Sequence, residues 1–180
     1  MRLHIIGIPS AGKTTLGTHL SSILRVPHHD LDSLVFLDEH WTLRTPTERD
    51  AMLAQILEEP SFVTEGGFLG WTTPLFAVAD HIVWLDPPLR TLMHRHIRRH
   101  RGHARMLPSL LLFQIRMYRR PEGAGPLLSD PDQTREGIAR ALRPWASKVV
   151  RVKGPVTAQD VVEGLGVADP PAQPPKRASN

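Results

Sequence analysis

Residues 7–15 read GIPSAGKTT and follow directly after the apolar run Leu3-His4-Ile5-Ile6. The segment matches G-x-x-x-x-G-K-[ST], a loop whose inward-facing backbone N–H groups bind phosphate oxygens. Apolar residues then recur at helical spacing, at Leu16, Leu20, Ile23 and Leu24. A strand, this loop and a helix in direct succession predict a phosphate-binding loop near the start of the chain.

The residue types of this loop each suit a phosphate. Gly7 and Gly12 let the backbone come close to the ligand, and the helix that follows adds its positive N-terminal end. Lys13 reaches the outer phosphates, and the hydroxyl of Thr14 can hold Mg²⁺. The chain has four lysines against eighteen arginines, and a compact point charge suits a phosphate. We expect nucleotide phosphates to bind at Gly7, Ser10, Ala11, Gly12, Lys13, Thr14 and Thr15.

Length and composition predict one globular domain. The chain has 180 residues, of which 41% are hydrophobic and none is cysteine. No apolar run approaches the length of a membrane span, and the first strand begins by Leu3, which leaves no room for a signal peptide. We therefore expect a cytoplasmic protein without membrane partners. Residues 166–180 are rich in Pro and Ala without periodicity, so the predicted domain covers residues 1–165 and the rest is a disordered tail.

The net charge of +4 comes from one segment. Residues 87–121 contain nine arginines and no acidic residue, which leaves thirteen basic against eighteen acidic residues elsewhere. Such a basic segment is typical of a nucleic-acid-binding surface. It is equally typical of a segment that closes over phosphates, which agrees with the loop at residues 7–15.

Further strands and helices alternate along the chain. Thr45, Pro46 and Glu48 have the spacing of a helix start with a capping box, and residues 80–86 are apolar nearly throughout, like a parallel strand covered on both faces. Alternation of this kind predicts a parallel sheet with helices on both faces. The predicted strands are 27–31, 61–65, 80–86 and 148–153, and the predicted helices are 45–60, 88–101, 108–119, 131–143 and 158–165.

Two further patterns carry a resemblance to a known group. The segment VTEGGF places Glu65-Gly66 at the end of the third strand, and Asp86 at the end of the fourth is followed by Arg95 at nine residues and Arg99 at thirteen. In these features the chain resembles adenylate-kinase-like P-loop kinases. It looks most like the bacterial DNA topology modulation proteins (FlaR-like) and shares local features with shikimate kinases.

The resemblance covers roughly residues 1–165 and implies a fold, cofactors and roles. The implied fold is an α/β P-loop three-layer sandwich with a five-stranded parallel sheet of order 2-3-1-4-5 and a helical lid at about 95–125. The implied cofactors are ATP and Mg²⁺, and the implied activity is phosphotransfer. Arg95 would stack on adenine and bind the nucleotide, and Arg99 would contact the transferred phosphate. The candidate catalytic residues are Lys13, Asp32, Arg95 and Arg99, and the candidate metal ligands are Thr14, Asp30 and Glu65.

One departure from the family bears on the phosphate acceptor. Adenylate kinases carry an acceptor-gripping arginine four residues after the third-strand acid, and the topology modulation proteins carry it at five. Leu69 and Gly70 stand at these positions. A neutral small-molecule hydroxyl acceptor is therefore favoured over a nucleoside monophosphate, unless Arg44 or Arg49 replaces the missing grip.

Asp30-Leu31-Asp32 resembles the D-x-D of shikimate kinases, in which one Asp helps the metal and the other binds the acceptor hydroxyl. Residues two apart in a strand point to the same side, so both carboxylates could face the cleft. Either could instead cap the following turn. The candidate substrate residues are Asp32, Arg44, Gly66 and Gly67.

The sequence also bears on other functions and on other roles for its histidine and aromatic residues. A GTP switch needs Asn-Lys-x-Asp, whereas the only asparagine is Asn180. A nucleotide-dependent nucleic-acid regulator is disfavoured because the basic residues lie where a lid is expected. His28 and His29 are too crowded for a metal site, and the histidines at 94, 96, 100 and 103 add to the basic face. Trp41, Phe68 and Trp71 either wall an acceptor pocket or pack in the core.

Overall fold

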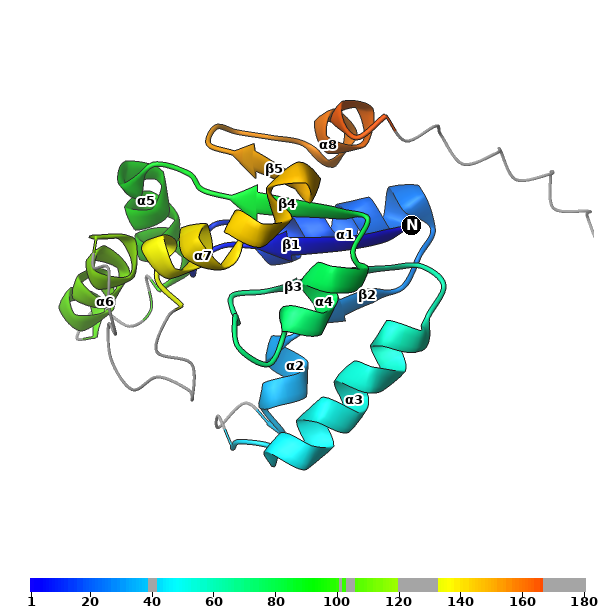
Figure 1. The fold of residues 1–180 in the computed structure, drawn as a ribbon. Helices are drawn as coiled ribbons and strands as arrows, with labels where there is room; N and C mark the ends of the chain where they lie inside the picture. Colours follow the sequence, from blue (N-terminus) through cyan, green and yellow to red (C-terminus); the bar gives the residue numbers. More distant parts are fainter. Residues whose placement is uncertain (39–41, 101, 103–105, 120–132, 167–180) are drawn as a thin grey trace, which may run out of the picture.

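The computed structural model describes residues 1–38, 42–100, 102, 106–119 and 133–166. Its centre is a five-stranded parallel sheet of order β2-β3-β1-β4-β5 (Figure 1). The strands are β1 (Arg2–Ile6), β2 (His28–Asp30), β3 (Phe62–Gly66), β4 (His81–Leu85) and β5 (Val149–Val152). The predicted fold class and strand order are confirmed.

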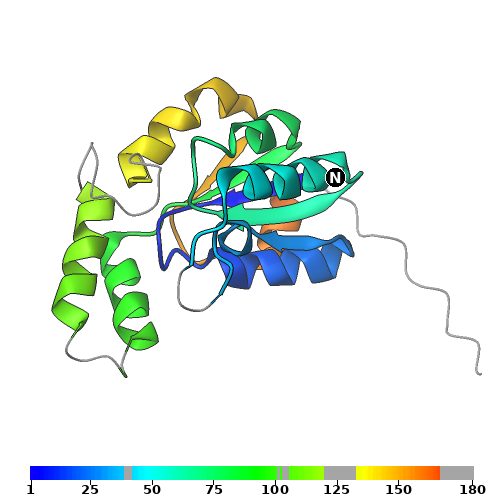
Figure 2. The same cartoon turned by 90° about the horizontal axis from the view of Figure 1, so that it is seen from below.

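Helices cover both faces of the sheet, as a parallel sheet requires. Figure 2 shows α1 and α8 on one side and α3, α4 and α7 on the other, while α5 and α6 stand beyond the carboxyl ends of the strands. The helices are α1 (Lys13–Leu24), α2 (Asp32–Val35), α3 (Pro46–Glu58), α4 (Thr73–Val78), α5 (Leu89–Arg99), α6 (Leu107–Arg119), α7 (Arg135–Ala141) and α8 (Ala158–Gly164), with a 3₁₀ helix, η1, at Arg143–Lys148.

The central strand β1 lies fully inside the core. Leu3, His4, Ile5 and Ile6 have no exposed surface, because β1 pairs with β3 on one side and β4 on the other. The main apolar cluster packs α1, α7 and α8 with the central strands. A smaller cluster packs α2, α3 and α4 against β3. This core holds the carboxyl ends of the strands, and the loops that follow them, in a fixed arrangement.

The structure corrects several predicted element bounds. The strand predicted at 27–31 ends at Asp30, and Asp32 begins the short helix α2. The predicted helix at 131–143 is described as α7 followed by η1. Neither α2, α4 nor η1 was predicted, because four- to six-residue helices carry too little periodicity to be recognised. The capping box of α3 is confirmed, with Thr45 and Glu48 bonded reciprocally.

The predicted lid is described in part. Helices α5 and α6 pack against each other, and α6 also contacts α7. Residues 101, 103–105 and 120–132, and those of the predicted tail beyond Gly166, lie outside the described residues. Among the helices that the structure describes, none combines the length and apolarity needed to cross a membrane.

Candidate functional site

The predicted phosphate-binding loop connects β1 to α1 at the centre of the sheet. Gly12 has φ 102 and Ser10 has φ 64, both in the left-handed region, which glycine adopts freely and serine does not. A Cβ at Gly7 would lie 2.7 Å from the carbonyl oxygen of Leu85, so only glycine fits there. Lys13 begins α1, and within the described chain no acidic side chain is ion-paired with it. The loop therefore presents a helix N-terminus and a lysine to the cleft.

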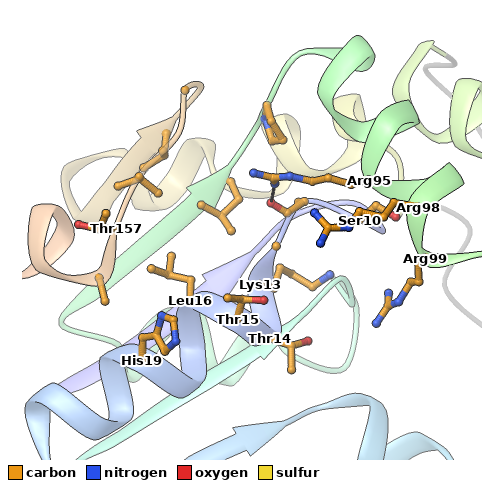
Figure 3. Close-up of a pocket in the computed structure, with 18 residues that line it drawn as sticks. Ser10, Lys13, Thr14, Thr15, Leu16, His19, Arg95, Arg98, Arg99 and Thr157 are labelled. Carbon is orange, nitrogen blue, oxygen red and sulfur yellow. Dashed lines mark hydrogen bonds between the residues drawn. The ribbon is translucent and has the colours of Figure 1, made fainter.

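A cavity of about 750 Å³ opens beside this loop. Figure 3 shows it between the loop, α5 and the segment that joins β5 to α8. Its size is that of a small-molecule site. The lining residues are Ser10, Ala11, Gly12, Lys13, Thr14, Thr15, Leu16, His19, Leu85, Pro87, Arg95, Arg98, Arg99, Val152, Gly154, Val156, Thr157 and Ala158.

Helix α5 contributes three arginines to this cavity (Figure 3). Arg95 Nη1 donates a hydrogen bond of 2.6 Å to the carbonyl oxygen of Ala11, and the same atom lies 3.2 Å from where a Cβ of Gly12 would stand. Arg99 lies close enough for its charge to act on Asp32. The third arginine, Arg98, was not predicted, although a spacing of three from Arg95 places both on one helix face.

The side chains of Glu65 and Thr14 are hydrogen-bonded next to the phosphate loop. Glu65 is 2% exposed, and burial raises the pKa of its carboxyl, while the bond to the Thr14 hydroxyl and the charge of Lys13 oppose this shift. The Glu65 Oε1 atom is buried without a hydrogen-bond partner. A buried carboxylate oxygen of this kind is available for a water or a cation.

These two residues fit Mg²⁺. In the part of the chain that the structure describes, no group of three or more His, Asp and Glu side chains is arranged to hold a metal ion alone. Mg²⁺ keeps several waters and takes further oxygens from substrate phosphates, so it needs few protein ligands. Thr14 and Glu65 would hold it through the hydroxyl and through the unpartnered carboxylate oxygen.

The two carboxylates of Asp30-Leu31-Asp32 do not share a side of a strand, which corrects the prediction. The Asp30 Oδ1 atom accepts a 2.9 Å hydrogen bond from the backbone N–H of Asp32, so Asp30 caps the turn into α2, as one of the two predicted alternatives had it. The chain turns here because the N–H of Leu31 still bonds to Glu65 while Leu34 N–H bonds back to Leu31. Asp32 thus stands at the start of a helix.

Asp32 nevertheless lies within electrostatic reach of Lys13 in the phosphate loop. Loss of hydration raises the pKa of its carboxyl above 3.8, the charge of Asp30 adds to this, and the charges of Lys13 and Arg99 oppose it. Because the residue keeps exposed surface, this loss of hydration is only partial. A carboxylate with a raised pKa, within reach of the charges of two cationic residues, is suited to accept a proton from a hydroxyl.

The remaining candidate substrate residues lie along the same edge of the sheet. Gly66 ends β3, and a Cβ there would come within 3.0 Å of the Leu31 side chain. A Cβ at Gly67 would lie 3.4 Å from the carbonyl oxygen of Gly7. Both glycines therefore allow the chain after β3 to pass close to the phosphate loop and to α2.

Arg44 and Arg49 have different surroundings. Arg44 Nη2 lies 3.5 Å from the carbonyl oxygen of Ser33, and its Nε is buried without a hydrogen-bond partner. Arg49 is ion-paired with Asp50 at 2.7 Å and lies over the ring of Trp71. Arg49 is thus neutralised by a neighbouring carboxylate, whereas Arg44 has a buried Nε donor without a hydrogen-bond partner.

The aromatic and histidine candidates are mostly structural. Phe68 is 3% exposed and lies against Trp71 with tilted rings whose centroids are 5.3 Å apart, so it packs in the core. His29 bonds to Glu59 at 3.1 Å, and His28 packs on Gly17. His96 is buried, not part of the basic face, because its Nδ1 bonds to the Ser10 hydroxyl. Trp41 and His103 lie outside the described residues.

Asp86, the reference point for the spacing of Arg95 and Arg99, is itself buried. Its carboxylate accepts hydrogen bonds from Arg135 at 2.5 and 2.9 Å and from Arg151 at 2.9 and 2.5 Å. Both arginines also lie over aromatic rings, Tyr118 and Trp84 respectively. The sequence contains no local signal for these pairs, since the partners are far apart in the chain.

Solved structures of other proteins have a fold similar to that of this chain. A gluconokinase from Sinorhizobium meliloti 1021 aligns over 92% of this chain and 91% of its own, at 18% identity and a TM-score of 0.58. An uncharacterized protein from Eubacterium ventriosum ATCC 27560 aligns over 93% of this chain and 100% of its own, at 10% identity and a TM-score of 0.54. The chain therefore has the fold of P-loop kinases.

One curated sequence is also similar. The uncharacterized protein YqaC from Bacillus subtilis (strain 168) is 32% identical over 103 residues, which are 54% of this chain and 58% of the relative. The match thus spans somewhat more than half of either protein. No protein-family model matches the chain.

Proposed function

We propose that this chain is an ATP- and Mg²⁺-dependent kinase that phosphorylates a hydroxyl group of a small molecule. The observation that carries the proposal is the electrostatic link between the cavity and Asp32. The phosphate loop and the arginines of α5 line the cavity, and the charges of two of these lining residues, Lys13 and Arg99, act on Asp32. The fold shared with a gluconokinase agrees with this activity.

The cavity has a part for each portion of ATP. The apolar residues Leu16, Val152 and Val156 would border the base, on which Arg95 would stack. The backbone N–H groups of the loop, with Lys13 and Arg99, would bind the phosphates. Thr14 and Glu65 would hold Mg²⁺, which when bound neutralises negative charge on the phosphates. Asp30 caps the turn into α2, so it would act near the metal without being one of its two main ligands.

Transfer of the γ-phosphoryl group then needs a general base and a fixed arrangement of ATP and the acceptor. The acceptor hydroxyl oxygen forms a bond to the γ-phosphorus while the bond from that phosphorus to the β–γ bridging oxygen breaks, which releases ADP. The hydroxyl proton passes to the carboxylate of Asp32 late in the transfer, as in protein kinases. Arg99 faces the charge that spreads on the transferred group. Gly66 and Gly67 leave room for the acceptor beside the loop.

The kinase domain would cover residues 1–165. A lid at about residues 95–125 would close over ATP and exclude water. The proposed location is the cytoplasm, and residues 166–180 are proposed to be a disordered tail outside this domain. We also propose that this chain is related to the bacterial DNA topology modulation proteins. A nucleic-acid-binding role is the less favoured reading, because Arg95, Arg98 and Arg99 line the cavity.

The second candidate is a nucleoside monophosphate kinase. It is supported by Arg44, whose Nε is buried without a hydrogen-bond partner and whose guanidinium could therefore bind an acceptor phosphate. Arg49 is a weaker substitute, since Asp50 already neutralises it.

A coupled assay of ADP release over nucleoside monophosphates, nucleosides, sugars, sugar acids and hydroxylated antibiotics tests the proposal. We expect turnover of a compound without phosphate. Lys13→Ala should abolish nucleotide binding, and Lys148→Ala, at the opposite ends of the strands, should not. Strong turnover of a nucleoside monophosphate, lost in Arg44→Ala, would support the second candidate instead.

Asp32→Asn keeps the shape of the side chain and removes the proton acceptor. We expect unchanged ATP affinity in calorimetry and a decrease in kcat of about 10²–10⁴. Asp50→Asn, a carboxylate on the exposed face of α3, is the matched control and should leave kcat unchanged. Full activity of Asp32→Asn would make Asp32 a structural residue of α2.

A further inference from the structure

The phosphate loop is bonded to α5 and α6 at three successive residues. Gln114 Nε2 donates a 3.0 Å hydrogen bond to the carbonyl oxygen of Pro9. The Ser10 hydroxyl is 2.9 Å from His96 Nδ1. Arg95 donates to the carbonyl oxygen of Ala11. The partners are 84 to 105 residues apart in the chain, so these bonds exist only when both helices pack against the loop.

Two of these bonds set the direction of backbone N–H groups. In a trans peptide the C=O and the following N–H point in opposite directions. The bond from Gln114 to Pro9 therefore orients the N–H of Ser10, and the bond from Arg95 to Ala11 orients the N–H of Gly12. N–H groups of such loops are the donors that bind phosphate oxygens. The side chains that bond to these two carbonyl groups thus set the direction of the N–H groups that are available to phosphate.

The third bond holds a strained residue. Ser10 has φ 64, a conformation that is unfavourable for a residue with a Cβ. Its hydroxyl is bonded to His96, which is 4% exposed, and burial lowers the pKa of that histidine, with the charges of His100 and Arg99 adding to the effect. His96 is thereby kept neutral and able to accept the hydroxyl hydrogen at Nδ1. Gln114 has no exposed surface, so water does not compete for its bond.

We propose that Gln114 and His96 are positioning residues that hold Pro9–Ala11 in the phosphate-binding conformation, so that nucleotide affinity depends on the docking of α5 and α6 against the loop. The inference rests on nucleotide binding at the loop, which is part of the proposed function. By linkage, nucleotide should in turn favour the docked arrangement of the two helices.

Gln114→Met keeps the length and buried volume of the side chain but removes the donor. We expect calorimetric titration with Mg²⁺ and the non-hydrolysable analogue adenylyl imidodiphosphate to give a Kd raised about tenfold, the effect of one well-shielded hydrogen bond. Where turnover is measurable, KM for ATP should rise by the same factor with kcat changed less than about threefold. Gln55→Met, on exposed α3, is the matched control and should change neither value.

The hydrogen bond between His96 and Ser10 is tested by two variants of His96 and by a double-mutant cycle. His96→Phe should raise Kd, whereas His96→Asn, whose amide can still bond to the Ser10 hydroxyl, should stay close to the original value. In a Ser10→Ala background, His96→Phe should have little further effect, because the bond is already lost. Such non-additivity would not arise if His96→Phe acted only by general destabilisation.

Unchanged Kd in both Gln114→Met and His96→Phe would overturn the inference, as would equal losses in His96→Phe and His96→Asn. These results are separate from the test of the proposed function. A protein that binds the analogue but phosphorylates no acceptor would contradict the kinase proposal and leave this inference standing. A protein that does not bind the analogue at all would overturn both.

Discussion

At the residue scale, the cavity contains more positive charge than the sequence motif alone predicts. Lys13 comes from the phosphate loop, and α5 adds Arg95, Arg98 and Arg99. Arg95 is already bonded to the loop, whereas the charge of Arg99 acts on Asp32. The spacing from Asp86 therefore identified two arginines in different environments, and the proposed function gives Arg99 the contact with the transferred phosphate.

Arg99→Ala tests that difference. We expect kcat to fall by about 10³ or more, the size of the effect of an arginine on phosphoryl transfer, with a smaller change in ATP affinity. Arg90→Ala removes an exposed arginine of the same helix that does not line the cavity, and its kinetics should match those of the unmodified protein. A loss of activity in Arg90→Ala as large as in Arg99→Ala would mean that only the total charge of α5 matters.

At the element scale, Asp86 holds three elements together at the carboxyl end of β4. Its buried carboxylate bonds to Arg135 at the start of α7 and to Arg151 in β5. The hydrogen bonds and charge of Asp86 raise the pKa of the Arg135 guanidinium. Since α7 contacts α6, the same carboxylate also holds in place the helix against which α6 packs.

Asp86→Asn should therefore destabilise the protein. Loss of the charge leaves two arginines without their partner, and we expect the free energy of unfolding in urea to fall by about 2–4 kcal/mol, since both arginines can partly rehydrate. Asp80→Asn makes the same change next to the opposite end of β4, at an exposed residue that accepts a bond from the N–H of Arg2. Its effect should stay below about 1 kcal/mol. Equal effects at the two sites would contradict the proposed role of the ion pairs.

At the scale of the whole molecule, burial of the central strand includes a histidine. His4 has no exposed surface and its Nδ1 lies 2.9 Å from the Thr64 hydroxyl of β3. Burial, with a smaller contribution from Lys13, lowers the pKa of His4 to about 3. The folded protein thus holds His4 neutral, while the unfolded chain takes up a proton below the ordinary pKa of 6.5.

The stability of the fold should accordingly fall with acidification. The contribution of His4 is fully present above pH 6.5 and is lost as pH falls toward 3. Between pH 8 and pH 5 this loss should reach about 2 kcal/mol. Urea unfolding of the protein and of His4→Leu at both pH values measures it, because His4→Leu removes the titration. An unchanged difference between pH 8 and pH 5 in His4→Leu would show that other groups cause the dependence.

Local patterns in the sequence were sufficient for the class of fold and the phosphate loop. The strand, loop and helix at residues 2–24 are contiguous, so their order is readable without any distant contact. The alternation of apolar strands with helices predicted the parallel sheet, and the family resemblance implied its order 2-3-1-4-5. Arg95 and Arg99 lie on one helix, so their relation to each other also follows from the sequence.

Only the tertiary structure decided how distant residues meet at the site. Asp32 belongs to a helix because Leu31 bonds to Glu65 of β3, a strand that begins thirty residues later. Gln114 and His96 bond to the phosphate loop, and Arg135 and Arg151 to Asp86, through the packing of whole elements. Such contacts depend on where several helices dock at once, and this docking is determined by apolar surface buried across the molecule. No sequence window contains that information.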